Sequence, residues 1–280
     1  METMKNLTVA CLKQVIKPRP KQSHKGNFGK ILIIGGNKNM GGAVIMSASA
    51  AVHAGAGLVT CATDSSNFFA LHARLPEEMV VDHSDFEALT QAIKQADTLV
   101  IGPGLGLDKL AKQILKITLR AVDPTTTLII DGSAITLLAQ QNEPLRPTCQ
   151  VIYTPHQVEW ARLSGLALTE QLPQANQSAQ QKLAAHVVLK KHHTEIYHLD
   201  NTLSRLPIGG PYMATGGMGD TLTGIIAAFM GQFKTLAPAD VLDAAVYLHS
   251  AVASDLSQSK YVVLPTDIIE HLQTFMAQFS

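Results

Sequence analysis

Short runs of β-branched residues alternate with segments of helical periodicity along most of this chain. Strands that alternate with helices form mostly parallel sheets whose two faces are covered by helices. We therefore predict one α/β domain over residues 1–280, with the sheet as the middle of three layers. The predicted strands are 30–35, 58–62, 98–102, 127–131, 151–154, 187–190 and 195–199. The predicted helices are 43–54, 86–95, 107–119, 133–140, 158–164, 177–185, 238–257 and 266–279.

One more helix is predicted inside YMATGGMGDTLTGIIAAFMGQF, residues 212–233. Asp220 stands at its expected N-cap or first turn, after three glycines. Glycines permit positive φ and close approach of a ligand, and a helix start offers unpaired N–H groups with a partial positive charge. The segment therefore predicts a site for an anion, most often a phosphate. The apolar positions of one helix face are Leu222, Ile225, Ile226, Phe229, Met230 and Phe233.

The carboxylate of Asp220 has two interpretations. In the first it caps a glycine-rich turn and has no chemical role. In the second it acts on a hydroxyl group that reacts with, or leaves with, the phosphate. The second interpretation explains why a negative charge stands where it would repel a bound anion.

Glycine or polar residues follow five of the predicted strands, and in parallel sheets ligands bind beyond the carboxyl ends of the strands. Neither common nucleotide-binding motif is present. GNKNMGG lacks the Lys-Ser/Thr pair of a P-loop, and no strand precedes G-x-G-x-x-G with a later acidic residue. We therefore predict a composite site of another layout. Its loops are GGNKNMGGA (35–43), GPGLG (102–106), DGSA (131–134), TPHQVE (154–159) and KKHHT (190–194).

The charge balance argues against nucleic-acid and membrane partners. Basic and acidic residues number 22 each, so the chain has neither a basic footprint nor a polybasic membrane patch. No apolar run reaches the ~20 residues of a membrane span, and residues 1–20 lack a signal-peptide core. Cys11, Cys61 and Cys149 are widely spaced and are predicted to be reduced thiols. We expect a cytoplasmic protein.

Several motifs occur in the order typical of ADP-dependent NAD(P)H-hydrate dehydratases, which belong to the ribokinase-like superfamily. The resemblance covers residues 20–280 and implies a ribokinase-like three-layer sandwich. Larger family members carry an N-terminal hydrate epimerase domain, whereas only an extension of residues 1–20 precedes the motifs here. The resemblance therefore implies that the epimerase is a separate chain. The motifs are SHKGNFGKILIIGGNKNMGGA, AGAGLVT, LPEEMVV, IGPGLG, TPHQVEWARL, VVLK and ATGGMGDTLTGIIAAF.

The resemblance implies repair of the S-form of NADH or NADPH hydrate, in which water has added across a ring double bond. ADP would phosphorylate the ring hydroxyl, and AMP and phosphate would be released as the reduced nicotinamide is restored. Such activation is reasonable because hydroxide leaves poorly, water having a pKa of about 15.7. The implied cofactor is Mg²⁺, with ADP as co-substrate, and the protein would mainly position and stabilise the transferring phosphoryl group.

Around the anion site, the resemblance assigns the catalytic base and a hydrate contact to Asp220. Gly217, Met218 and Gly219 would form an anion hole from backbone N–H groups. Met218 replaces the usual serine or alanine, a change that a site made of backbone should tolerate. The alternative is that Asp220 only caps the start of the helix and takes no part in the chemistry.

On the loop TPHQVE, the resemblance implies that His156 contacts the hydrate and that Glu159 holds Mg²⁺ or water. The sequence HQVE replaces the common His-Pro-Gly-Glu, which leaves the local backbone path open. Alternatively, Glu159 is a helix-start glutamate bonded to its own backbone.

The resemblance places the nucleotide-binding segment at KKHHT, together with Gly219. Lys191 replaces a glycine that is usual in the family, and the alternative is a solvated basic pair beside two histidines. His192 and His193 are not expected to share a face, so a metal site is not predicted there. The segment consists of Lys190, Lys191, His192, His193 and Thr194.

Ala43, Gly104 and Gly106 are implied contacts of the dinucleotide hydrate, or else residues of ordinary tight turns. Asp131 is the one acid that persists from an Asp-Ala-Asp pattern, and its role is open. The helix within AVIMSASAAVHAGAG is rich in small residues, so we expect it to pack closely against a helix of the same or another subunit. The resemblance favours a homo-oligomer, specifically a tetramer.

Two other functions use the same residues. An ATP-dependent kinase of a vitamin or sugar alcohol would share the anion site and Asp220 but would release a stable phosphorylated alcohol. A nucleotide sensor without catalysis would bind and never turn over. A nicotinamide-dependent dehydrogenase is disfavoured because its nucleotide fingerprint is missing.

Overall fold

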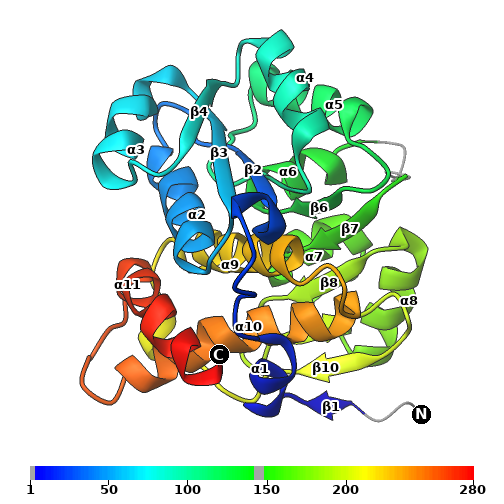
Figure 1. Cartoon of the computed structure of the whole chain (residues 1–280). Coiled ribbons are helices and arrows are strands. Elements are labelled where there is room, and N and C mark those ends of the chain that lie inside the picture. The colour runs from blue at the N-terminus through cyan, green and yellow to red at the C-terminus, as the bar shows by residue number, and fades with distance from the viewer. Residues whose placement is uncertain (1–3, 142–147) are drawn as a thin grey trace.

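The computed structural model describes residues 4–141 and 148–280, which form helices around one central sheet (Figure 1). The sheet has ten strands in the order β1-β10-β9-β8-β7-β6-β5-β2-β3-β4. Strand β9 is antiparallel to both of its neighbours, and the other neighbouring pairs are parallel. The strands are β1 Lys5–Asn6, β2 Lys30–Ile34, β3 Leu58–Thr63, β4 Met79–Asp82, β5 Thr98–Ile101, β6 Thr127–Ile130, β7 Gln150–Tyr153, β8 His186–Leu189, β9 Glu195–Tyr197 and β10 Leu203–Arg205.

Helices cover both faces of the sheet because successive residues of each strand point to opposite sides. Ile31 and Ile33 of β2 pack with α1, α2, α9, α10 and α11, whereas Leu32 and Ile34 pack with α4 to α8. The expected α/β three-layer sandwich is therefore confirmed. The helices are α1 Ala10–Val15, α2 Gly41–His53, α3 Phe68–Arg74, α4 Phe86–Gln95, α5 Lys109–Ala121, α6 Gly132–Ala139, α7 Gln157–Ser164, α8 Pro173–Leu183, α9 Met218–Gln232, α10 Pro238–Leu256 and α11 Pro265–Met276.

Every predicted strand and helix is present, with ends displaced by a few residues. Three strands were missed: β1, β4 and β10. Two short helices, α1 and α3, were missed as well. These elements are two to seven residues long, too short to show a clear hydrophobic period. The cysteines Cys11, Cys61 and Cys149 are buried free thiols, as expected.

The residues that were expected to form an N-terminal extension are integrated into the sheet. Strand β1 pairs with β10, and α1 packs against α10. Lys5 Nζ lies 3.3 Å from Asp243 Oδ2, and the other oxygen of Asp243 lies 3.0 Å from His198 Nε2. These contacts tie the start of the described chain to α10 and to the residue that follows β9.

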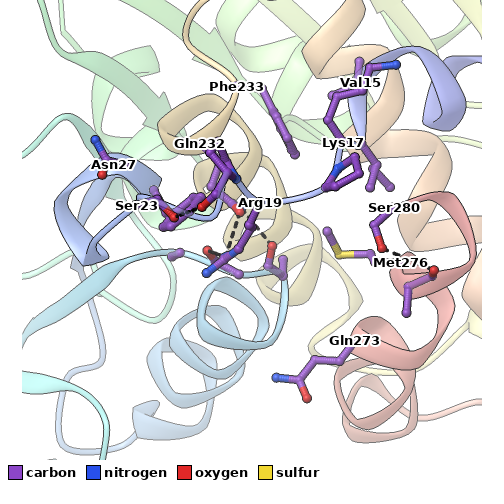
Figure 2. A pocket seen from close by; sticks show the side chains of 18 of the residues that line it. Val15, Lys17, Arg19, Ser23, Asn27, Gln232, Phe233, Gln273, Met276 and Ser280 are labelled. Atoms are coloured by element: carbon purple, nitrogen blue, oxygen red, sulfur yellow. Dashed lines mark hydrogen bonds between the residues drawn. The ribbon is translucent and has the colours of Figure 1, made fainter.

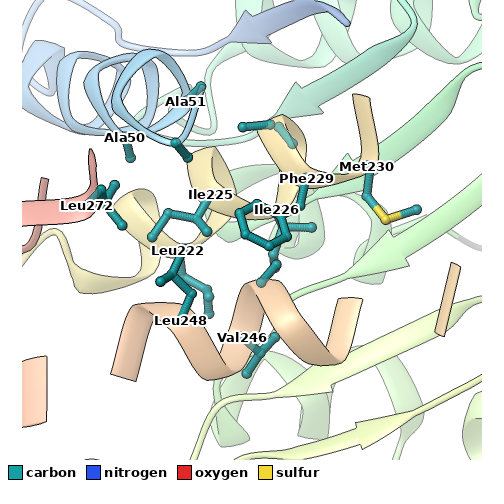
Figure 3. Close-up of a cluster of buried hydrophobic side chains, with 14 of the residues drawn as sticks. Ala50, Ala51, Leu222, Ile225, Ile226, Phe229, Met230, Val246, Leu248 and Leu272 are labelled. Carbon is teal, nitrogen blue, oxygen red and sulfur yellow. The ribbon is translucent and has the colours of Figure 1, made fainter. Parts of the chain in front are cut away.

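Helix α9 differs from its expected one-sided pattern because it is buried on every side from Thr221 to Gly231. Figure 3 shows α9 between α2 and α10, with Ile225 and Phe229 among the packed side chains. Asp220 lies in the first turn, while the N-cap is Gly217 at φ 96°. The helix thus runs from a glycine start at the edge of the sheet into the core.

The small residues of α2 serve close packing inside the chain. Ser47 Oγ lies 3.2 Å from Thr223 Oγ1 of α9. A methyl group added to Gly224 would lie 2.0 Å from the carbonyl oxygen of Ser47 and 2.9 Å from Cβ of Ala50. The two helices therefore approach each other closely only because Gly224 has no side chain.

Replacing this glycine should destabilise the protein strongly. We expect Gly224→Ala to lower the free energy of unfolding by about 3 kcal/mol, because a backbone carbonyl cannot move aside for the new methyl group. Gly42→Ala is the control: Gly42 is an exposed helical glycine of α2, and no atom lies within 4 Å of its added methyl group. Gly42→Ala should raise stability by ~0.5–1 kcal/mol. Equal effects in urea unfolding would contradict this packing.

Candidate active site

A cavity of about 430 Å³ lies beyond the carboxyl end of β8, next to the start of α9. The whole segment that was expected to bind nucleotide lines it, and so do two residues of the expected anion hole. Such a volume is within the range of small-molecule sites. The sequence-predicted lining residues are Lys190, Lys191, His192, His193, Thr194, Met218 and Gly219.

The rest of this cavity was not foreseen. Leu206 and Ile208 follow β10, while Val246, His249 and Ser250 come from α10. The three α10 positions fall at i, i+3 and i+4, so they share one helix face. In the sequence, that spacing predicts a buried helix face, but it does not show whether the residues line a cavity or pack in the core.

Lys190 is the central cation of the site. Its Nζ lies 2.7 Å from Asp131 Oδ1, and the same oxygen accepts a hydrogen bond of 2.7 Å from the Thr154 hydroxyl. Burial opposes the charge of Lys190, but the Asp131 carboxylate outweighs this effect and raises the pKa of the ammonium. A methyl group added to Gly219 would lie 3.0 Å from Nζ, so the ammonium stands directly beside the first turn of α9.

Asp220 lies in that first turn, in a partly buried position. Burial raises the pKa of its carboxyl to about 7, with the Asp131 carboxylate acting in the same direction and Lys190 in the opposite one. The helix has no side-chain cap hydrogen bond at its N-cap, and Asp220 lies three residues further on. A carboxylate with this pKa can exchange a proton near neutral pH, as a general base must.

His156 and Glu159 together begin α7 as a capping box. Nδ1 of His156 accepts from the backbone N–H groups of Val158 and Glu159 at 3.1 and 3.3 Å. Oε2 of Glu159 accepts from the backbone N–H of His156 at 2.8 Å. The helix-start interpretation of Glu159 therefore describes its contacts here. The N-terminal cap also fixes the imidazole of His156, whose side chain is about half exposed at 52%.

The acidic side chains of this site offer little for direct metal binding. Across residues 4–141 and 148–280, no group of three or more His, Cys, Asp or Glu side chains could hold a metal ion. Glu159 is engaged in its capping box, and Asp131 is engaged by Lys190. These acids therefore fit a magnesium ion that is held mainly by substrate phosphates and water, with one or two carboxylates nearby, which is the usual arrangement for this metal.

One expectation about KKHHT is wrong, and so is the alternative of a solvated basic pair. The rings of His192 and His193 lie side by side, with centroids 4.0 Å apart and planes tilted by 54°, and His193 has a positive φ of 59°. The lysines are not a solvated pair either. Lys191 Nζ lies 2.7 Å from the buried Glu195 carboxylate, and Lys190 is paired with Asp131.

Ala43, Gly104 and Gly106 lie beyond the ends of β2 and β5, and none of them lines the cavity of about 430 Å³. A methyl group added to Gly104, at φ 61°, would lie 2.4 Å from the Met40 carbonyl oxygen and 3.0 Å from Cβ of Ala43. Gly106 N donates to Ser133 Oγ at 3.1 Å. In the sheet order, β5 is three strands and β2 four strands from β8, which corresponds to about 14 and 19 Å at ~4.8 Å per strand. A methyl group added to Gly217 would lie 2.3 Å from Met46 Sδ of α2, and one added to Gly219 would lie 3.0 Å from Lys190 Nζ, so the start of α9 lies between α2 and the end of β8.

A second cavity, of about 980 Å³, lies at the C-terminal ends of α2 and α9 (Figure 2). There Arg19 donates to Gln232 Oε1 at 3.1 Å and stacks over the Phe28 ring. No Asp or Glu side chain of the described residues lines it. Because the 15 residues of α9 span about 22 Å, this cavity is far from Asp220.

Of the helices that the structure describes, none combines the length and the apolar character needed to cross a membrane.

Known proteins resemble this chain along its whole length. A protein of Lactiplantibacillus plantarum named ADP-dependent (S)-NAD(P)H-hydrate dehydratase is 51% identical over 277 residues, covering 99% of this chain and 98% of the relative. The crystal structure of a ribokinase-like superfamily protein from Enterococcus faecalis matches with a TM-score of 0.95 and 48% identity, covering 99% and 96% of the two chains.

A more distant solved structure comes from a protein that was crystallised with a nucleotide. The ADP/ATP-dependent NAD(P)H-hydrate dehydratase from Bacillus subtilis, co-crystallised with ATP and Mg²⁺, matches with a TM-score of 0.87 and 26% identity over 99% of both chains. The family model described as NAD(P)H-hydrate dehydratase matches residues 31–274. With this match and the close relatives, the chain belongs to the NAD(P)H-hydrate dehydratase family, within the ribokinase-like superfamily.

Proposed function

We propose that this chain dehydrates the S-form of NADH or NADPH hydrate, consuming ADP and releasing AMP and phosphate. One observation carries the proposal. The partly buried carboxylate of Asp220 lies in the glycine-rich first turn of α9, the partly buried ammonium of Lys190 stands beside that turn, and both adjoin a cavity of about 430 Å³. This arrangement suits transfer of a phosphoryl group to a hydroxyl better than it suits binding alone.

In the first step, Asp220 takes the proton of the ring hydroxyl as its oxygen attacks the β-phosphorus of ADP. The bond from that phosphorus to the oxygen bridging to the α-phosphate breaks, and AMP leaves. Lys190 and the N–H groups of Gly217, Met218 and Gly219 stabilise the negative charge that moves during transfer. Removing one aimed donor of this kind typically costs ~10²–10³ in rate.

In the second step, the lone pair of the ring nitrogen expels the phosphate from the neighbouring carbon. A proton leaves the adjacent ring carbon, and the double bond of the dihydropyridine is restored. Phosphate carries away the oxygen of the former hydroxyl, so the atoms balance. The protein holds the ring during this step, and we assign that role to His156 together with Ala43, Gly104 and Gly106.

The other parts of the proposal concern cofactor and partners. Magnesium bound to ADP would neutralise phosphate charge, and Glu159 would reach it through water. A separate epimerase would convert the other hydrate epimer into the substrate. The chain would assemble as a homotetramer and act in the cytoplasm.

The direct assay follows absorbance of reduced nicotinamide from purified NADH hydrate with Mg²⁺ and either ADP or ATP. We expect absorbance to return, with AMP and phosphate formed in equal amounts when ADP is supplied. Accumulation of a stable phosphorylated alcohol, without reduced nicotinamide, would instead identify a kinase.

The rate should depend on pH through Asp220. Burial raises the pKa of this carboxyl to about 7, and only the ionised form can accept the hydroxyl proton. We therefore expect kcat/KM to fall about tenfold for each pH unit below 7 and to level off above it. The measurement is a pH series of kcat/KM for the hydrate; an inflection near pH 4 would contradict the assignment.

A further inference from the structure

His249 is a buried histidine in the wall of the nucleotide cavity that the proposed chemistry does not use. It lies on α10 between Val246 and Ser250, and all three residues line the cavity. His249 is only 5% exposed, and its Nε2 is buried without a hydrogen-bond partner.

An unpaired buried nitrogen is costly. Leaving such a group without a partner costs about 1–3 kcal/mol, so native proteins retain few of them. Burial, with the charge of Lys190 as a second cause, lowers the pKa of His249 to about 4. The imidazole is therefore neutral at pH 7 and can both donate and accept a hydrogen bond. The unpaired Nε2 destabilises the free protein, and a bound ligand could supply the missing hydrogen-bond partner.

The rest of the wall indicates what that partner is. Leu206, Ile208, Leu222 and Val246 give the cavity an apolar lining that suits the flat face of a base. Small-molecule sites combine such a lining with a few polar groups that fix orientation. Of the α10 residues that line this cavity, His249 and Ser250 are the polar ones, and the basic segment that begins at Lys190 lines the same cavity.

We propose that His249 is a specificity-determining residue of the nucleotide site, whose imidazole forms a hydrogen bond with the nucleoside part of bound ADP. A turn of the ring about its last torsion, which is broad for histidine, presents Nε2 to a ligand that fills the cavity. The inference rests on the proposed function in one respect, namely that ADP occupies this cavity.

Calorimetric titration of the intact chain with ADP and Mg²⁺ tests the proposal. We expect His249→Leu to weaken ADP binding about tenfold, since one hydrogen bond is lost at similar side-chain volume. His249→Gln, which keeps a polar group near the position of Nε2, should stay within about threefold of the unchanged protein. His53→Leu is the matched control, because His53 lines the distant large cavity and should leave ADP binding unchanged.

Thermal unfolding of the free proteins separates binding from packing. His249→Leu should melt no lower than the unchanged protein, because it removes an unpaired buried nitrogen. Unchanged ADP affinity in His249→Leu would overturn this inference and leave the proposed function standing. An equal loss of ADP affinity in the Leu and Gln variants would also overturn it, since the loss would then come from the changed side-chain shape and not from the hydrogen bond. If the unchanged protein fails to bind ADP with Mg²⁺, both the inference and the proposed function fall.

Discussion

Asp220→Asn should abolish turnover and at the same time make the protein more stable. The amide cannot accept the hydroxyl proton, so we expect kcat for NADH hydrate to fall by about 10³-fold or more. ADP should still bind, because the cavity and the backbone N–H groups of the anion hole are unchanged. The measurements are steady-state rates and calorimetric titration with ADP and Mg²⁺.

The stability gain follows from the raised pKa of Asp220. The carboxyl titrates at about 7 in the folded protein and near 3.9 when unfolded, so the folded state binds the proton more tightly. Between pH 4 and 7 the folded protein therefore loses stability as pH rises, because ionisation is costly in the site. Removing the charge should stabilise Asp220→Asn by about 2 kcal/mol at pH 8, a value reduced for partial exposure, and by nothing below pH 4.

Urea unfolding at pH 8 and at pH 3.5 measures that difference. A variant as active as the unchanged protein would remove Asp220 from the chemistry. A variant that is inactive and also less stable at pH 8 would mean that Asp220 has a structural role instead. Both results can be told apart from the expected combination of lost activity with gained stability.

Lys190→Met should damage both folding and catalysis. The substitution leaves the Asp131 carboxylate, 3% exposed, without its cationic partner. Removing one member of a buried ion pair typically costs 3–5 kcal/mol, and we expect a loss of about 3 kcal/mol here. The charge beside the first turn of α9 is lost as well, so the rate should fall by about 10²–10³-fold.

A second substitution separates the two effects. Lys190→Met combined with Asp131→Asn removes the uncompensated charge, so most of the stability should return while the activity stays low. The control is Lys234→Met, which breaks the exposed pair with Asp97 at 3.1 Å and should cost no more than about 1 kcal/mol. If the double variant regains activity along with stability, Lys190 serves the fold and not the transfer.

Much of the architecture could be predicted because its signal is local. Runs such as Lys30–Ile34 in β2 and the helical spacing of α4 follow from neighbouring residues alone. The complete burial of α9 could not be predicted in this way. Its second and third faces consist of residues such as Thr223, Gly224 and Ala227, which look neutral in a sequence and become core only because α2 and α10 lie against them.

The site was predictable where glycine marks a helix start, as at Gly217, and where a charge follows a strand, as at Lys190. Two features depend on contacts that no local pattern reports. The pair of Lys190 with Asp131 joins residues 59 apart in the chain. His249 belongs to a helix whose buried face also makes ordinary core contacts, so its place in a cavity wall follows only from the packing of α10 against α9.

The destination of one oxygen atom tests the central claim most directly, namely that phosphorus is joined to the ring hydroxyl before elimination. NADH hydrate carrying a heavy-oxygen label in that hydroxyl would be turned over with ADP and Mg²⁺ by the intact chain. The released phosphate would then be analysed by mass spectrometry. We predict that each phosphate contains the labelled oxygen; unlabelled phosphate, with the label found in water, would contradict the mechanism.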